Sequence, residues 1–259
     1  MSKLPPQYAF TDLSDYGRTA GRSIASRFKN TSCTPIHLTT AFIVAGLLAV
    51  TCIGYGHYKS AALLLILKSV IDAADGELAR LKNTPSYTGR YYDSVADIIL
   101  NFIILTVIAL STETALWLAF LAFIGLQLQG TLYNYYYVIL RNRHNGDTTS
   151  RIFENTRPLA LAGESQITVN AMYFLYTLLY SSFDKIIYRL DPNAVKIDHL
   201  PGWFMTLVSV FGLGFQLLLI SILLATGLED FIIPVLLGMT VLIPVFIGLR
   251  KVIKSLELY

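Results

Sequence analysis

Long apolar runs are the feature that most limits how this chain can fold. Several of them lack the polar face that a helix of a soluble protein turns towards water. A helix that spans a bilayer needs about 20 mainly apolar residues. Only 14% of the 259 residues are charged, against about 25% in soluble domains. The sequence therefore predicts an all-α integral membrane protein with six to seven transmembrane helices.

The chain divides into two predicted parts. Residues 1–33 form a polar cytoplasmic segment without a cleavable signal peptide. Within it, apolar residues recur at helical spacing over 12–29, which predicts an amphipathic helix on the membrane surface or on the protein's own cytoplasmic face. Residues 34–259 form the transmembrane catalytic domain. Its apolar segments are expected near residues 38–57, 61–81, 88–111, 113–140, 164–183, 202–226 and 230–250.

Basic residues predict the orientation of these segments. They gather before the first segment, around Arg80–Arg90 and in the 141–163 loop. The positive-inside rule places these three regions in the cytoplasm. The end of the chain does not fit this scheme, because seven spans would leave Arg250 and Lys251 outside. The net charge of +3 is too small to indicate a nucleic-acid partner.

Acidic side chains inside two consecutive apolar segments indicate a function. Asp72 and Asp75 are three residues apart, and Asp93 and Asp97 are four apart, so each pair shares one helix face. The short turn around Pro85 makes the two helices antiparallel neighbours, and the four carboxylates then converge. Such a cluster needs cations to neutralise it within a membrane. Oxygen ligands without His or Cys favour Mg²⁺ or Mn²⁺.

Small residues and an arginine accompany the carboxylates. Gly76, Ala79 and Gly89 leave room for a bulky group to approach the two helices. Arg80 supplies a planar fork of donors that suits a phosphate. Carboxylates for metal, small residues for a planar base and an arginine for phosphate together indicate a nucleotide-diphosphate site at the cytoplasmic face of the membrane.

The spacing of these residues resembles a known family signature. The run Asp72-Ala-Ala-Asp75-Gly76-Glu-Leu-Ala79-Arg80, followed by Gly89, Asp93 and Asp97, is similar to that of the CDP-alcohol phosphotransferases. The resemblance implies a membrane enzyme of phospholipid synthesis. It would transfer a substituted phosphate from a CDP-linked donor to an alcohol, release CMP and form a homodimer. Six spans are usual for small members of this family.

The resemblance also implies a role for each residue of the motif. Asp72, Asp75 and Asp93 would coordinate two Mg²⁺ or Mn²⁺ ions. Asp97 would be the fourth carboxylate of this metal site and the general base that acts on the acceptor hydroxyl. The nucleotide would lie against Gly76, Ala79, Arg80 and Gly89.

Two substrate pairs stay open within the family. One is CDP-diacylglycerol with a small polar acceptor such as serine, glycerol phosphate or an inositol phosphate. The other is CDP-choline or CDP-ethanolamine with diacylglycerol. The segment from Asp93 to Asp97 resembles phosphatidylserine-type synthases and favours the first pair, which we expect. The Glu164-Ser-Gln166 sequence is similar to an element of choline and ethanolamine phosphotransferases and favours the second.

Residues after the fourth apolar segment are candidates for binding the acceptor. The arginines could hold a phosphate or carboxylate, or could be ordinary cytoplasmic positive charges. The acidic and amide residues could contact the acceptor or mark a helix boundary. These candidates are Arg141, Arg143, Arg151, Arg157, Glu164 and Gln166. A cation transporter or channel that uses the same acids is the alternative from another class, although the chain has no internal repeat.

Overall fold

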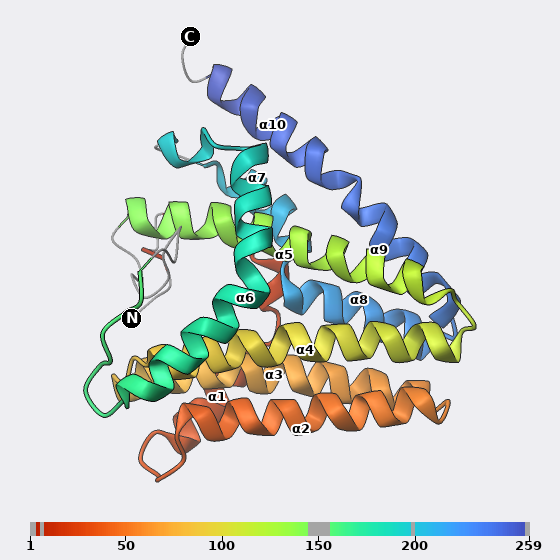
Figure 1. Ribbon diagram of the computed structural model, residues 1–259, viewed down its shortest axis with the longest axis horizontal. Helices are drawn as coiled ribbons and strands as arrows, with labels where there is room; N and C mark the ends of the chain where they lie inside the picture. Colours follow the sequence, from red (N-terminus) through yellow and green to blue (C-terminus); the bar gives the residue numbers. More distant parts are fainter. Residues whose placement is uncertain (1–3, 6–7, 145–155, 198–199, 257–259) are drawn as a thin grey trace.

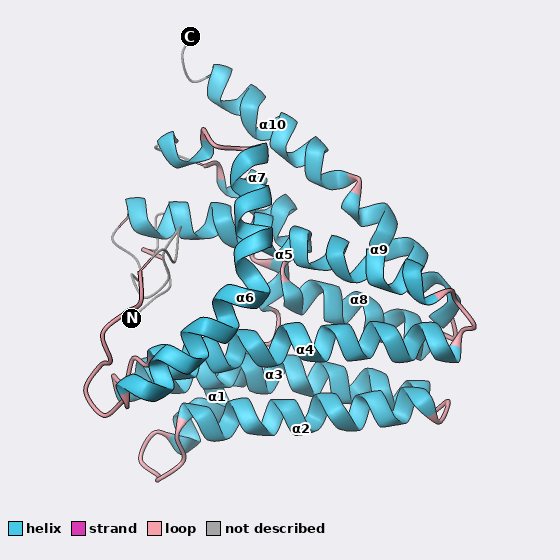
Figure 2. Cartoon of the chain, viewed as in Figure 1, coloured by secondary structure: helices cyan, strands magenta, loops and turns pink. Residues whose placement is uncertain are grey.

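The computed structural model describes residues 4–5, 8–144, 156–197 and 200–256. Every regular element among these residues is a helix (Figure 2), which confirms the all-α prediction. The helices are α1 (Arg18–Phe28), α2 (Pro35–Gly54), α3 (Tyr58–Lys82), α4 (Tyr87–Ser111), α5 (Leu116–Arg143), α6 (Gln166–Leu190), α7 (Gly202–Val208), α8 (Leu213–Thr226), α9 (Ile232–Thr240) and α10 (Leu242–Leu256). Short 3₁₀ turns lie at η2 (Leu13–Asp15), η3 (Ala194–Lys196), η4 (Ser209–Phe211) and η5 (Glu229–Phe231).

Several of these helices are long and apolar enough to cross a membrane. By length and composition, four described stretches qualify, namely Pro35–Gly54, Tyr87–Ser111, Leu116–Arg143 and Glu229–Ile253. A fifth is the pair Gly202–Phe211 and Leu213–Thr226, bent by 54°. The chain is thus a multi-pass membrane protein with four to five apolar span candidates. The predicted segments 61–81 and 164–183 form α3 and α6, whose polar and charged residues keep them outside this set.

The turn between α3 and α4 makes these two helices antiparallel. Asn83 ends α3 in the left-handed conformation, with φ 51°, and its N–H donates to the carbonyls of Ala79 and Arg80. Ser86 caps α4, because its side chain accepts a hydrogen bond from the Gly89 N–H. Both helices pack on α2 (Figure 1), while α3 also contacts α1 and α8, and α4 contacts α5 and α6.

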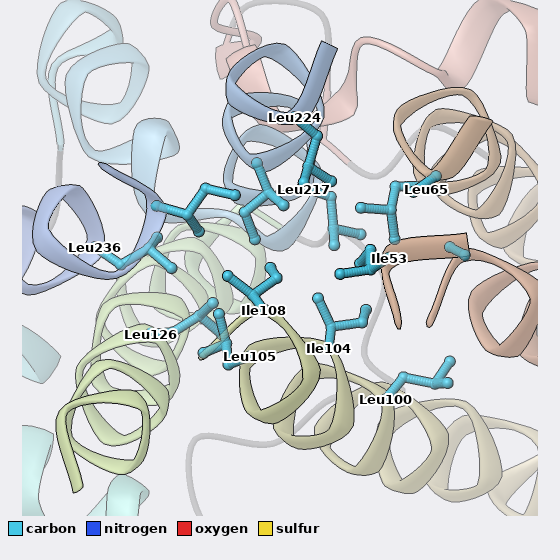
Figure 3. Close-up of a cluster of buried hydrophobic side chains, with 14 of the residues drawn as sticks. Ile53, Leu65, Leu100, Ile104, Leu105, Ile108, Leu126, Leu217, Leu224 and Leu236 are labelled. Carbon is cyan, nitrogen blue, oxygen red and sulfur yellow. The ribbon is translucent and has the colours of Figure 1, made fainter. Parts of the chain in front are cut away.

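The main apolar core fills the end of the bundle away from this turn. Buried leucine and isoleucine side chains from α2, α3, α4, α5, α8 and α9 meet there (Figure 3). On α3, Leu65 belongs to this core, whereas Asp72 and Asp75 lie further along towards the turn. On α4, the order is reversed, with Asp93 and Asp97 before Leu100 and Ile104. The antiparallel arrangement therefore brings all the acids to one end.

Helix α1 lies close against α3. A Cβ atom built on Gly21 would lie 2.9 Å from the backbone nitrogen of Ala74, so only glycine fits there. The buried residues of α1 are Gly21 and Ala25. Among the apolar residues at helical spacing in 12–29, Leu13 and Phe28 are each 37% exposed, whereas Ile24 is partly buried. The buried face of α1 therefore consists of small residues that allow a close helix crossing.

Candidate active site

Three of the predicted carboxylates form a compact cluster. Asp72, Asp75 and Asp93 each offer one oxygen, and these oxygens lie within 4.8 Å of one another. Thr39 on α2 donates a 2.7 Å hydrogen bond to Asp75, whereas the buried Oδ1 of Asp93 has no hydrogen-bond partner among the residues that the structure describes. An oxygen-only cluster with an unpartnered buried oxygen fits a hard divalent cation.

Asp97 is not part of this cluster and has a partner of its own. Lys68 on α3 forms an ion pair with Oδ1 of Asp97 and lies 3.8 Å from Asp72. The Lys68 side chain is completely buried, with its Nζ over the ring of Phe42 at 4.6 Å. Lys68 thus pairs with two of the four acids, and four ionised carboxylates this close together need more positive charge beside them.

Lys68 is a residue of the site that was not predicted from the sequence. A lysine within an apolar run is itself a signal, because a charge at membrane depth needs a partner. It also precedes Asp72 by four residues, which places both on one face of α3. These two facts could have identified it, although the contact with Asp97 depends on how α3 and α4 pack.

The carboxylates open into a cavity of about 450 Å³ between α3, α4, α5, α6 and α8, with η2 on one side. Gly76 and Arg80 line it beside the acids. The nearest atoms to a Cβ built on Gly76, outside its own helix backbone, would be those of the Arg80 guanidinium, at 3.6 Å. The described residues that line the cavity do not include Ala79 or Gly89. The structure therefore places two of the four proposed nucleotide contacts in the cavity wall.

Glu77 of α3 connects that helix to Arg18, at the start of α1. Its carboxylate accepts from Arg18 at 2.8 Å and pairs with Arg80 at 3.1 Å. The side chain of Arg80 is thereby held on the cavity side of α3. Arg18 lines the cavity as well, so the turn into α1 forms part of its wall.

The candidate acceptor residues fall in different places. Arg141 is buried, lines the cavity and lies over the ring of Tyr137 at 5.0 Å. Arg143 donates to the carbonyl of Val195 at 3.0 Å, and Arg157 is exposed. Arg151 lies outside the described residues.

Glu164 and Gln166 make contacts within the protein. The Glu164 carboxylate accepts from the backbone N–H groups of Tyr87 and Thr88 and from the Ser86 hydroxyl, at 2.7–3.2 Å. It therefore caps the first turn of α4. Burial raises the pKa of this carboxyl, but the hydrogen bonds from Thr88, Ser86 and Leu161 outweigh it, so the pKa is lowered. Gln166 bonds the backbone of Pro158 and Ala160.

Comparison with known proteins agrees with the cluster and with the membrane helices. Residues 32–183, more than half of the chain, match the CDP-alcohol phosphatidyltransferase family. The chain belongs to this family of membrane transferases of phospholipid synthesis. The matched region contains α2 to α5 and most of α6, and so all four acids. Comparison with curated proteins gives no significant match.

Proposed function

We propose that this chain transfers the phosphatidyl group of CDP-diacylglycerol to the hydroxyl of a small polar alcohol and releases CMP. The observation that carries the proposal is the arrangement of the acids. Asp72, Asp75 and Asp93 cluster, while Asp97 stands beside them at the wall of a cavity with many polar residues. Membership of the family supports transfer from a CDP-alcohol in general.

Asp72, Asp75 and Asp93 would hold the divalent cations, with Asp97 next to them. Their oxygen-only donor set and the unpartnered Asp93 Oδ1 suit Mg²⁺ or Mn²⁺. Two such ions would neutralise the diphosphate and stabilise the charge that develops on the leaving CMP.

The protein's own residues orient the two substrates. Arg80 can hold a phosphate of the donor, and Gly76 leaves the space in front of it open. Lys68 binds one oxygen of Asp97, so the other oxygen remains for the acceptor hydroxyl. In the transfer, Asp97 takes the hydroxyl proton as the oxygen bonds to the phosphatidyl phosphorus. The bond from that phosphorus to CMP breaks, and CMP leaves with the electron pair.

Choline or ethanolamine phosphotransfer to diacylglycerol has less support from the site. The similarity to those enzymes rests on Glu164 and Gln166. Glu164 caps α4 and Gln166 is tied to Pro158, and neither lines the cavity among the described residues. The contacts of these two residues account for their presence without an acceptor.

We also propose that α3 and α6 cross the membrane, which would give six to seven spans with the carboxylates at the cytoplasmic face. In α3, the charged Lys68 and Asp75 are buried while Leu63 and Leu67 are exposed. In α6, Phe174 and Leu178 are exposed. Both helices therefore present apolar side chains outwards, as lipid contact requires. Labelling of cysteines placed in the 83–86 turn, in sealed vesicles of known orientation, tests this topology.

The enzymatic proposal can be tested with the purified full chain in detergent. CMP release is measured from CDP-diacylglycerol with serine, glycerol 3-phosphate or inositol phosphate, and from CDP-choline with diacylglycerol. We expect release from CDP-diacylglycerol that depends on Mg²⁺ or Mn²⁺ and on one of the polar acceptors. Release from CDP-choline alone would contradict the assignment of donor and acceptor.

A further inference from the structure

Three carboxamide side chains line the cavity beyond Asp97. Asn101 lies one turn further along α4, Gln127 comes from α5 and Gln216 comes from α8. Their residues are only 5%, 6% and 0% exposed. These three buried carboxamides are called the amide wall here, and the cavity lining also includes the apolar side chains of Leu126 and Leu213.

Hydrogen bonds fix the orientation of the Gln216 amide. Its Nε2 donates to the backbone carbonyl of Leu126 at 3.3 Å and to Oε1 of Gln129 at 3.0 Å. Gln129 is oriented in turn, because its Nε2 donates to the carbonyl of Leu236 at 3.1 Å. A carbonyl can only accept, so the nitrogen of Gln216 must point towards Leu126. Its Oε1 is therefore the atom left over.

Two atoms of the amide wall lack a hydrogen-bond partner. Both Gln216 Oε1 and Gln127 Nε2 are buried, and neither has a partner within the described part of the chain. Buried polar groups are almost always hydrogen-bonded, and a protein loses stability when one is not. Two of them on the wall of one cavity indicate that a polar ligand supplies the missing partners.

We infer that Gln127 and Gln216 bind the hydroxyl-bearing acceptor, which is a small polar alcohol. A hydroxyl donates one hydrogen bond and accepts others, so it can satisfy an amide oxygen and an amide N–H together. A molecule with more than one polar group can reach Asp97 with one hydroxyl and the amide wall with another. This inference rests on the proposed function and specifies which part of the cavity selects the acceptor.

The amide wall disfavours diacylglycerol as the acceptor. The glycerol of that lipid carries two long acyl chains beside its free hydroxyl, and an acyl chain would make no hydrogen bond to the carboxamides of Asn101, Gln127 and Gln216. Burying a polar group against an acyl chain without a hydrogen bond is unfavourable. A polar acceptor would form hydrogen bonds to Gln127 and Gln216, whereas diacylglycerol would leave their amide atoms without partners. The amide wall therefore favours the polar acceptor.

Matched glutamine variants separate binding from structure. Gln127→Met removes an amide whose Nε2 has no hydrogen-bond partner among the described residues. Gln129→Met is the control, because Gln129 belongs to the same network but does not line the cavity. The assay is CMP release from CDP-diacylglycerol while the concentration of serine, glycerol 3-phosphate or inositol phosphate is varied.

We expect Gln127→Met to raise the acceptor KM by about five- to tenfold, the effect of one lost hydrogen bond. Its affinity for CDP-diacylglycerol and its melting temperature should not fall. Gln129→Met should lower the melting temperature and keep the acceptor KM, because the carbonyl of Leu126 still orients the Gln216 amide. A Gln127→Met KM within twofold of the original, or an equal rise in Gln129→Met, overturns the inference. If the unchanged protein releases no CMP with any polar acceptor, the proposed function itself fails.

Discussion

Two buried ion pairs differ in how completely the protein satisfies their charges. The Arg250–Asp191 pair lies outside the cavity lining, whereas Asp97 of the Lys68–Asp97 pair belongs to it. Arg250 of α10 forms an ion pair with Asp191, which follows α6 and is fully buried. Tyr136 donates to the same carboxylate at 2.8 Å, and Tyr135 donates to the Asp191 carbonyl at 3.0 Å. None of these residues lines the cavity. This carboxylate is satisfied from several sides by the protein itself.

The pair in the cavity wall is incomplete by comparison. Lys68 contacts one oxygen of Asp97, and Asp97 opens into the cavity with three more carboxylates nearby. A buried charge is tolerated when it is paired and hydrogen-bonded. Where the protein leaves acids without enough positive charge, something else must supply it. The difference between the two pairs distinguishes a structural contact from a binding site.

The largest expected effect comes from the carboxylate cluster. Asp72→Asn, Asp75→Asn and Asp93→Asn should each nearly abolish both donor binding and CMP release, because each removes one oxygen ligand with its charge. Excess chelator should have the same effect on the unchanged protein. The measurement is metal-dependent affinity for CDP-diacylglycerol together with CMP release. Full turnover in chelator would contradict the assignment of a metal site.

Asp97→Asn should give the next largest effect and should differ in kind. Loss of a general base lowers turnover by about 10²–10⁴-fold. Affinity for the donor should stay within a few-fold of the original, since Asp97 is held by Lys68 rather than clustered with the other three. Single-turnover rates and donor affinities are compared for Asp97→Asn and Asp72→Asn. If both lose donor affinity equally, Asp97 is chiefly a metal ligand.

Arg250→Met should affect stability and leave the chemistry intact. It removes the cation but leaves Asp191 buried among α5, α6 and α10. Breaking a buried pair in this way destabilises a protein by about 3–5 kcal/mol. The melting temperature in detergent should fall clearly, while CMP release per folded molecule and acceptor KM stay unchanged. A selective loss of turnover in well-folded Arg250→Met would remove the contrast between the two ion pairs.

Glu164→Gln should have the smallest effect, and that effect should depend on pH. A lost helix cap lowers stability by about 0.5–2 kcal/mol. The folded protein lowers the pKa of Glu164, so its contribution is present above the unfolded pKa of about 4.3 and disappears as pH falls through the lower folded value. The difference in melting temperature between Glu164→Gln and the original should be constant near neutral pH and vanish in acid. A difference that grows in acid would contradict this role.

Several features were predictable because they depend on residues close together in the chain. The helix pair around Pro85 follows from a short polar turn between apolar runs. The convergence of Asp72, Asp75 and Asp93 follows from helical spacing on both sides of that turn. The number of spans was less predictable, because α3 and α6 combine polar residues with apolar ones. Neither is apolar enough by composition to count as a span candidate.

Contacts between distant segments could not be read from the chain. Glu164 caps α4 from 78 residues away from Ser86, and α1 turns Gly21 and Ala25 towards α3, with Ile24 partly buried beside them. Gln127 and Gln216 are unremarkable in the sequence, since a glutamine in an apolar helix usually bonds a neighbouring helix.

The amino-acid sequence was enough to predict an all-helical membrane protein of the CDP-alcohol phosphatidyltransferase family, with its acids on two consecutive helices. Local spacing and hydropathy suffice for this, because helix periodicity and transfer to lipid act on residues a few positions apart. Only the tertiary structure decided that Lys68 pairs with Asp97, that Asp191 is fully satisfied and that two amide atoms in the cavity lack partners. Hydrogen-bond satisfaction depends on which helices meet, and that is settled by packing over the whole bundle.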